Sequence, residues 1–252
     1  MLVVNNLFVS FGGVTALNLE RFSVKENELR VIIGPNGAGK STFMDIICGK
    51  TKAQKGSVLF KGQELMGMAE VDIAKMGVGR KFQKPSIFSG LSVFDNLLLG
   101  IKTHKNVFST YFYKLKSHHN DKIYEVAKMV GLIDDLQSLA GSLSHGKKQW
   151  LEIAIVMLQD ADLMLIDEPA AGMSDIEAEK TGELLVEASK THSVIVIEHD
   201  MKFVEQIAID KVNVLVRGEM LTEGTFDEIK NNKDVIDCYL GSPDSAQEAK
   251  VA

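Results

Sequence analysis

The sequence predicts an α/β protein with an antiparallel β part and an inserted helical sub-domain, and three observations support this fold class. An apolar run from Val31 stops at a glycine-rich loop, and a segment with apolar residues at helical spacing follows it. Two further apolar runs, Leu163–Glu168 and Ser193–Ile197, predict buried strands that alternate with helices. Leu2–Phe11 and Leu17–Val24 are predicted strands around a Gly12-Gly13 turn, which is typical of an antiparallel hairpin.

Composition limits the classes of protein to consider. The chain has 252 residues, 45% of them hydrophobic, which is enough for a sizeable core in one large domain. A net charge of −6 argues against nucleic-acid binding as the main role. Cys48 and Cys238 lie far apart and predict neither a disulfide nor a metal site. No apolar run approaches ~20 residues, and the N-terminal residues lack the charged-then-apolar pattern of a secretion signal, so we expect a cytosolic protein that reaches a membrane through partners.

The loop from Gly34 to Ser41 fits the pattern G-x-x-x-x-G-K-[ST] between a strand and a helix. Glycines at these positions let backbone N–H groups surround phosphate oxygens, and the helix N-terminus adds its positive dipole end. Lys40 is then placed to reach the β and γ phosphates, and the Ser41 hydroxyl to ligate Mg²⁺. The loop therefore predicts a binding site for a nucleoside triphosphate.

Polar residues follow the other buried strands, and parallel strands would bring them to the same edge of a sheet. Asp167 could hold the hydration shell of Mg²⁺, and Glu168 could accept the proton of a water that attacks the γ phosphate. Gln83 could ligate Mg²⁺ or orient a water, although glutamine is common at strand ends. His199 is either a contact to the γ phosphate or an ordinary loop histidine.

A helical segment is predicted from Pro85 onward, and it contains a basic, aromatic stretch between Lys102 and Lys122. That stretch could face acidic lipid headgroups or a partner, but we favour a solvated face. The neighbouring His118 and His119 have no third ligand at metal spacing and are predicted to be surface residues.

A second anion site is predicted where Ser144 precedes an amphipathic helix. Within one chain this site is redundant, which suggests that it serves a second copy of the molecule. Capping boxes at Ser174 and Thr225 predict two further helix starts, and residues beyond Leu240 are predicted to fray.

These motifs, in this order and spacing, resemble the ATP-binding subunits of ABC transporters over nearly the whole chain. The resemblance implies a P-loop ABC ATPase fold with core residues 1–84 and 159–240, a helical sub-domain at 85–158 and a flexible tail at 241–252. It implies catalytic roles for Glu168 as general base, His199 as γ-phosphate switch, and Lys40. The ATP-binding residues that it implies are Phe11, Gly34, Pro35, Asn36, Gly37, Ala38, Gly39, Lys40, Ser41 and Thr42.

The resemblance also implies partners and a metal. Two copies, or two similar subunits, would sandwich two ATP molecules, with Ser144, His145 and Gly146 binding in trans. Ser41, Gln83 and, through water, Asp167 would hold Mg²⁺, and Gln83 would also contact transmembrane permease subunits served by a solute-binding protein. Phe11 would stack on adenine; from its position alone we expect a core phenylalanine on a strand.

Two departures from the family pattern refine the prediction. His145 and Lys147 stand where most members have glycine and glutamine, and Ser174 stands where most have aspartate, which leaves the dimer contact at that loop open. The Leu-Ser-His-Gly turn and Trp150 look most like the urea-uptake branch, so urea import is the first prediction. The alternatives are import of branched-chain amino acids and a soluble ATPase outside transport, although the chain lacks the long coiled coil or second cassette of those soluble members.

Overall fold

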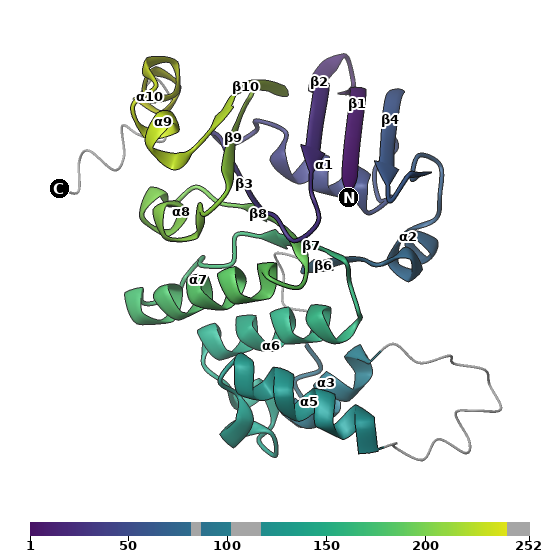
Figure 1. Ribbon diagram of the computed structural model, residues 1–252, viewed down its shortest axis with the longest axis vertical. Helices are drawn as coiled ribbons and strands as arrows, with labels where there is room; N and C mark the ends of the chain where they lie inside the picture. Colours follow the sequence, from purple (N-terminus) through teal and green to yellow (C-terminus); the bar gives the residue numbers. More distant parts are fainter. Residues whose placement is uncertain (82–86, 102–116, 241–252) are drawn as a thin grey trace.

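The computed structural model describes residues 1–81, 87–101 and 117–240, and it contains two sheets (Figure 1). The smaller sheet is antiparallel, with strand order β2-β1-β4-β5. It includes the predicted hairpin, whose strands pair from Leu2 with Val24 to Phe11 with Val14. The strands of this sheet are β1 Leu2–Phe11, β2 Val14–Val24, β4 Lys55–Phe60 and β5 Gln63–Glu64.

The larger sheet has six strands in the order β10-β9-β3-β8-β7-β6. All its neighbouring pairs are parallel except β9 with β10, so the predicted α/β class is confirmed. The carboxyl ends of β3, β6, β7 and β8 therefore meet at one edge, where the candidate residues follow. The strands are β3 Leu29–Ile33, β6 Val78–Lys81, β7 Leu163–Asp167, β8 Ser193–Ile197, β9 Lys211–Val216 and β10 Glu219–Gly224.

The larger sheet is buried on both faces, and its strands divide their side chains between two hydrophobic cores. In β3, Val31 and Ile33 pack into the core formed with the helices, whereas Ile32 packs into the core shared with the antiparallel sheet. In β8 the same alternation separates Val196 from Ile197. The sheet is thus the central layer between the two cores.

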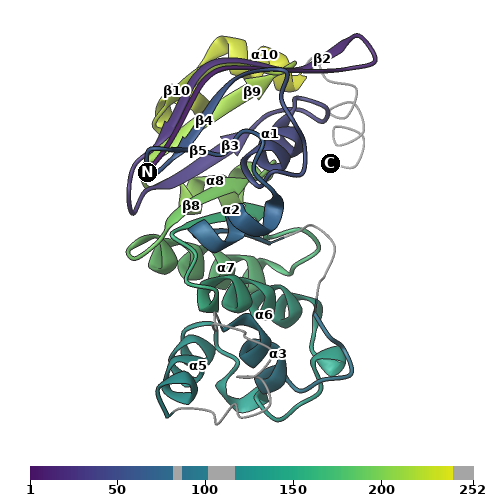
Figure 2. The same cartoon turned by 90° about the vertical axis from the view of Figure 1, so that its right-hand side faces the viewer.

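Helices cover this layer and extend it at one end (Figures 1 and 2). The helices that lie beside the sheets are α1 Lys40–Ile47, α2 Glu70–Met76, α7 Asp175–Ser189, α8 Met201–Ile207, α9 Phe226–Lys230 and α10 Lys233–Leu240. The helices gathered at the far end from the antiparallel sheet are α3 Val93–Gly100, α5 Ser117–Met129 and α6 His145–Leu158. Short 3₁₀ turns at Ile133–Asp135 and Ala140–Ser142 join α5 to α6.

Local sequence signals set several element boundaries. Both predicted capping boxes are present: Ser174 and Glu177 start α7, and Thr225 and Glu228 start α9. The predicted turn after β4 is shorter than expected, because only Lys61 and Gly62 turn, both at positive φ, and β5 pairs back at once. Two residues at positive φ match the right-handed twist of a hairpin, which explains the tight connection.

Some predictions lie outside the described residues. Gln83, most of the basic stretch from Lys102 to Lys122, and the tail 241–252 belong to this group, as do the side chains of His118 and His119. The described parts of the predicted helical sub-domain are helices and turns, but the domain boundaries remain a prediction.

Candidate functional site

The loop between β3 and α1 needs glycine for steric reasons at two positions. Gly34 has φ of 153°, and a Cβ there would lie 2.0 Å from the Leu215 carbonyl oxygen. Gly39 has φ of 99°, and a Cβ there would lie 2.4 Å from the Ala16 carbonyl oxygen. Any larger residue at either position would push the loop away from the adjoining strands, so the glycines fix its curvature.

This loop ends in a helix start that suits an anion. The N-cap residue of α1 is Gly39, no side chain caps the helix within the described residues, and no acid lies in its first turn. The Lys40 ammonium is buried and donates to the carbonyl oxygens of Gly34 at 2.6 Å and Pro35 at 3.1 Å. Burial lowers the pKa of Lys40, while Glu168 and Asp167 act in the opposite direction. Uncapped amides beside a buried cation form a fitting cradle for phosphate oxygens.

Two carboxylates follow strand β7 and lie near Lys40. Asp167 is buried, its Oδ2 lies 3.5 Å from Arg80 Nη2, and burial raises its pKa. Glu168 has φ of 46°, a conformation that side-chain-bearing residues rarely adopt, and its N–H donates to the Ile197 carbonyl oxygen. That backbone geometry leaves the Glu168 side chain only 24% exposed beside the loop.

His199, at the end of β8, lies beside Glu168. Its Nδ1 is 3.7 Å from Glu168 Oε1, and its side chain is 59% exposed. Glu198 next to it is buried and accepts the backbone N–H groups of Ala170 and His199. The pKa of Glu198 is raised, and burial is the largest cause. Sequence reasoning gave Glu198 no role, although its place directly after an apolar strand was a usable signal.

Phe11 corrects one prediction made from position alone. Its side chain is 53% exposed near the turn of the β1–β2 hairpin, so it is not a core phenylalanine. Asn18 of the same hairpin is linked to the loop through Gly218, because the Asn18 amide donates to the Gly218 carbonyl oxygen and the Gly218 amide donates to that of Ala38. An exposed ring on this hairpin is available for stacking on a planar ligand.

Ser144 caps α6 and is held by α7 of the same chain rather than by the phosphate loop. Its hydroxyl accepts the Lys147 N–H at 3.3 Å and lies 3.2 Å from Glu177 Oε1. His145 Nε2 lies 3.1 Å from the Ala171 carbonyl oxygen, and a Cβ on Gly146 would lie 2.5 Å from Glu177. Figure 1 places the start of α6 away from α1, so one chain does not bring the two predicted anion sites together.

The Mg²⁺ prediction has partial support from the donor set. Ser41 stands in the first turn of α1 and Asp167 at the end of β7, and a hydroxyl with a carboxylate suits a hard cation. Gln83 lies outside the described residues. Within the ranges that the structure describes, no group of three or more His, Cys, Asp or Glu residues could form a protein-only metal site. The residues present therefore fit an ion that shares its ligands with a bound phosphate.

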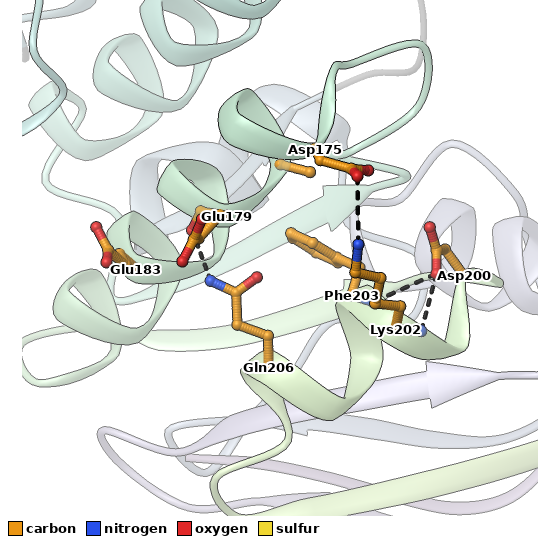
Figure 3. Close-up of a pocket in the computed structure, with 8 residues that line it drawn as sticks. Asp175, Glu179, Glu183, Asp200, Lys202, Phe203 and Gln206 are labelled. Atoms are coloured by element: carbon orange, nitrogen blue, oxygen red, sulfur yellow. Dashed lines mark hydrogen bonds and ion pairs between the residues drawn. The ribbon is translucent and has the colours of Figure 1, made fainter.

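A separate groove of about 540 Å³ lies between α7 and α8 and contains none of the predicted site residues (Figure 3). Lys202 crosses it to reach Asp175 at 3.4 Å, and Gln206 donates to the Glu179 carbonyl oxygen at 2.6 Å. Its lining residues are Asp175, Ala178, Glu179, Glu183, Asp200, Lys202, Phe203 and Gln206. The groove is thus bridged by the chain's own contacts.

Across the described part of the chain, no helix is both long and apolar enough to span a bilayer.

Comparison with known families agrees with the geometry of the site. Residues 17–171 match the model of the ABC transporter family, and residues 219–245 match that of the branched-chain amino acid ATP-binding cassette transporters. The chain is similar to the high-affinity branched-chain amino acid transport ATP-binding protein LivG of Salmonella typhimurium, with 36% identity over 96% of this chain and 98% of that protein. It is 34% identical to the corresponding protein BraF of Pseudomonas aeruginosa, over 96% and 98%.

Solved structures give the same answer for the fold. A nucleotide-free ATP-binding cassette of an ABC transporter superimposes with a TM-score of 0.83 and 28% identity, over 96% of this chain and 99% of that chain. The ADP conformation of such a cassette gives 0.84 and 26%, over the same shares. These scores over nearly the full length of both chains show that the fold is the same. The chain therefore belongs to the ATP-binding subunits of ABC transporters, in the branch of the branched-chain amino acid importers.

Proposed function

We propose that this subunit hydrolyses ATP to energise the import of branched-chain amino acids through permease partners at the inner face of the membrane. The observation that carries this proposal is the match of residues 219–245 to the branched-chain cassette model, beside relatives named for the same solutes. The sequence prediction of urea rested on the turn around His145 and on Trp150, and none of the relatives reported above is named for urea. The amino acids therefore replace urea as the proposed solute.

ATP binding is proposed at the loop from Gly34 to Thr42. The free amides at the start of α1 and the Lys40 ammonium would contact the β and γ phosphates, replacing the carbonyl contacts that Lys40 now makes. The exposed ring of Phe11 would stack on adenine. Ser41, Gln83 and Asp167 would hold Mg²⁺, which when bound supplies positive charge to the phosphate oxygens.

Hydrolysis is proposed to use Glu168 and His199. The carboxylate of Glu168 would accept the proton of the attacking water, because it stands at the strand end beside Lys40 and is partly exposed to the site. His199 would donate to a γ-phosphate oxygen from the neighbouring strand end.

Completion of the site is proposed to need a second copy. Ser144, His145 and Gly146 lie at the far helical end from α1 in one chain, so they would reach ATP bound by a partner. Two copies related by a two-fold axis would then share two ATP molecules. A related cassette, 22% identical, has been solved as a dimer bound to ADP and phosphate, which is a property of that protein.

The permease contact is proposed at an exposed apolar patch made of Phe88, Leu91 and Leu139. These side chains are 59%, 38% and 57% exposed, and backbone bonds from Leu91 to Phe88 and from Ala140 to Leu91 hold them together. Exposed apolar patches of this kind mark contact surfaces. Leu139→Asp is expected to release the subunit from its membrane partners in pull-down, whereas Leu221→Asp on β10 should not.

The solute is tested with the native complex in membrane vesicles. ATP-driven uptake of labelled leucine, isoleucine, valine and urea would be compared in vesicles with wild-type and with Glu168→Gln subunit. We expect uptake of the three amino acids to require the wild-type subunit. Urea uptake without amino acid uptake would overturn the proposed solute but not the ATPase.

A further inference from the structure

Lys81, the last residue of β6, is a buried cation to which the proposed function gives no role. Its side chain is 1% exposed, and its Nζ lies 3.9 Å from Oε2 of Glu152, a side chain on α6 that is 3% exposed. Among the described residues, the Lys81 ammonium has no hydrogen-bond partner. The contact to Glu152 is therefore an attraction between charges rather than a hydrogen bond.

Two consecutive cations on β6 point to opposite faces of the sheet. Arg80 reaches Asp45 of α1 and Asp167 on one face, whereas Lys81 reaches α6 on the other. In register, Lys81 pairs with Ile166, the residue before Asp167. Lys81 thus lies at the carboxyl end of β6, on the sheet edge where the proposed nucleotide site lies, but its side chain faces α6.

The charges around Lys81 belong to both regions. Burial lowers its pKa, and Glu152, Asp167, Glu198 and Glu168 act against that effect, in this order of size. Asp167 and Glu168 belong to the proposed nucleotide site. Glu152 belongs to α6, which begins after Ser144 two turns earlier. A change in charge at the nucleotide site therefore changes the net pull on an ammonium that is also attracted by α6.

We propose that Lys81 is a positioning residue that couples the occupied phosphate site to the Ser144 turn, by holding α6 through Glu152. An α-helix moves as a rigid body over the two turns from Glu152 to Ser144. A displacement at Glu152 is therefore passed to the Ser144 turn, which is proposed to contact the partner's ATP. A buried charge pair is a poor way to gain stability alone, because an apolar pair of similar size is often at least as stable. The inference rests on the proposed trans role of the Ser144 turn.

Trp150 offers a direct readout, because it is the single tryptophan of the chain and lies two residues from Glu152. Its Nε1 donates to Thr181 Oγ1 of α7 at 2.8 Å, and Lys180 Nζ lies 4.3 Å from its ring centre. A shift of α6 against α7 changes both contacts. Its fluorescence therefore reports the position of α6 when nucleotide binds.

The test compares Lys81→Met, Glu152→Gln and the double variant, with thermal unfolding, ATP affinity, ATPase rate and Trp150 fluorescence as readouts. Each single variant removes one charge of the buried Lys81–Glu152 pair and should lower the melting temperature, while the double variant should recover most of it. We expect the double variant to bind ATP within about threefold of wild type but to lose about tenfold in kcat. Its fluorescence response to ATP should be strongly reduced.

A matched control uses a buried ion pair that lies elsewhere in the same sheet. Glu28 and Arg30 are 2.6 Å apart and almost fully buried at the amino end of β3. Arg30→Met with Glu28→Gln should alter stability and leave the Trp150 response unchanged. Recovery of both stability and the full ATP response in the Lys81 and Glu152 double variant would reduce Lys81 to a structural role and overturn the inference. A wild-type protein whose Trp150 signal ignores ATP would also overturn the inference. Failure of the trans role itself would appear separately, as an ATP-dependent mass in light scattering that Ser144→Arg does not change.

Discussion

The helix starts of α1 and α6 were both predicted to bind anions, and the structure makes them very different. α1 follows Gly39, has no side-chain cap within the described ranges and has Lys40 beside it. α6 follows Ser144, whose hydroxyl already caps the helix and lies 3.2 Å from the Glu177 carboxylate. The first terminus is open to an anion, while the second is occupied by groups of its own chain.

This difference in capping indicates that the two helix starts have different roles. A phosphate can enter the loop before α1 by replacing carbonyl contacts to Lys40. At Ser144 a phosphate would meet the negative charge of Glu177, so binding there requires that side chain to give way. We infer that the loop captures ATP and that the Ser144 turn responds afterwards, when a second copy closes.

The largest effect that tests the open terminus is the loss of turnover in Glu168→Gln. The amide is nearly isosteric but cannot accept the proton of the attacking water, so kcat should fall by about 10²–10⁴-fold while ATP affinity is retained. Steady-state ATPase and nucleotide titration measure the two quantities. Glu187→Gln, on the exposed face of α7, is the control. A rate within a few-fold of wild type would remove Glu168 from the role of base.

A somewhat smaller effect is expected from Lys40→Ala, which removes the cation beside the uncapped amides. Deleting a charged donor to phosphate should weaken ATP binding by about 10²-fold. Titration with a fluorescent ATP analogue measures the affinity. Lys61→Ala, whose exposed ammonium pairs with Asp162, should leave affinity unchanged. Equal affinities for the Lys40 variant and wild type would show that the helix terminus alone holds the nucleotide.

A third prediction concerns the occupied terminus and the proposed dimer. In a Glu168→Gln background, Mg-ATP should increase the mass measured by light scattering at high protein concentration, and Mg-ADP should not. Adding Ser144→Arg should abolish the increase, because its bulk blocks the γ phosphate of the partner's ATP. A mass that is equal with both nucleotides, or that is insensitive to Ser144→Arg, would contradict the sandwich of two copies.

The sequence predicted best those features that depend on residues close together in the chain. Strand β8 has the predicted bounds Ser193–Ile197, and both capping boxes start their helices, because periodicity and capping are local signals. The loop from Gly34 to Ser41 was identifiable because one continuous segment carries all its groups. Strand β5 was not predicted: Gln63 and Glu64 were expected to belong to the turn after β4, since turn length depends on how two strands twist together.

Contacts between distant segments could not be predicted in the same way. The pairs Ser144 with Glu177 and Lys81 with Glu152 join residues far apart in the chain, so only the packed fold brings them together. From its position alone Phe11 was expected to be buried, because strand phenylalanines usually are, and only the family resemblance favoured an exposed ring that stacks on adenine. Phe11 is exposed because it is the last residue of β1, next to the turn of the hairpin. The sequence did carry one unused signal: two adjacent cations in a short strand of a sheet buried on both faces.

The smallest expected effect is a difference between the Glu177→Gln and Glu228→Gln variants. These residues belong to two capping boxes that are chemically alike but lie in different places. Hydrogen bonds from the backbone and hydroxyl of Ser174 lower the pKa of Glu177 below its usual 4.5, and Thr225 does the same for Glu228. Because each pKa is lower in the folded protein, each carboxylate stabilises the fold fully above about pH 4.5 and loses that contribution as pH falls through the folded value. Glu177→Gln and Glu228→Gln should therefore flatten the acid side of the stability profile to a similar, small extent, as measured by urea unfolding between pH 3 and 7. Only Glu177 also faces Ser144, so only Glu177→Gln should lower, by about two- to threefold, the ATP concentration needed for dimer formation. Equal ATP requirements in the two variants would mean that Glu177 does not oppose phosphate binding, and the contrast between the open and the occupied helix start would then be one of capping alone.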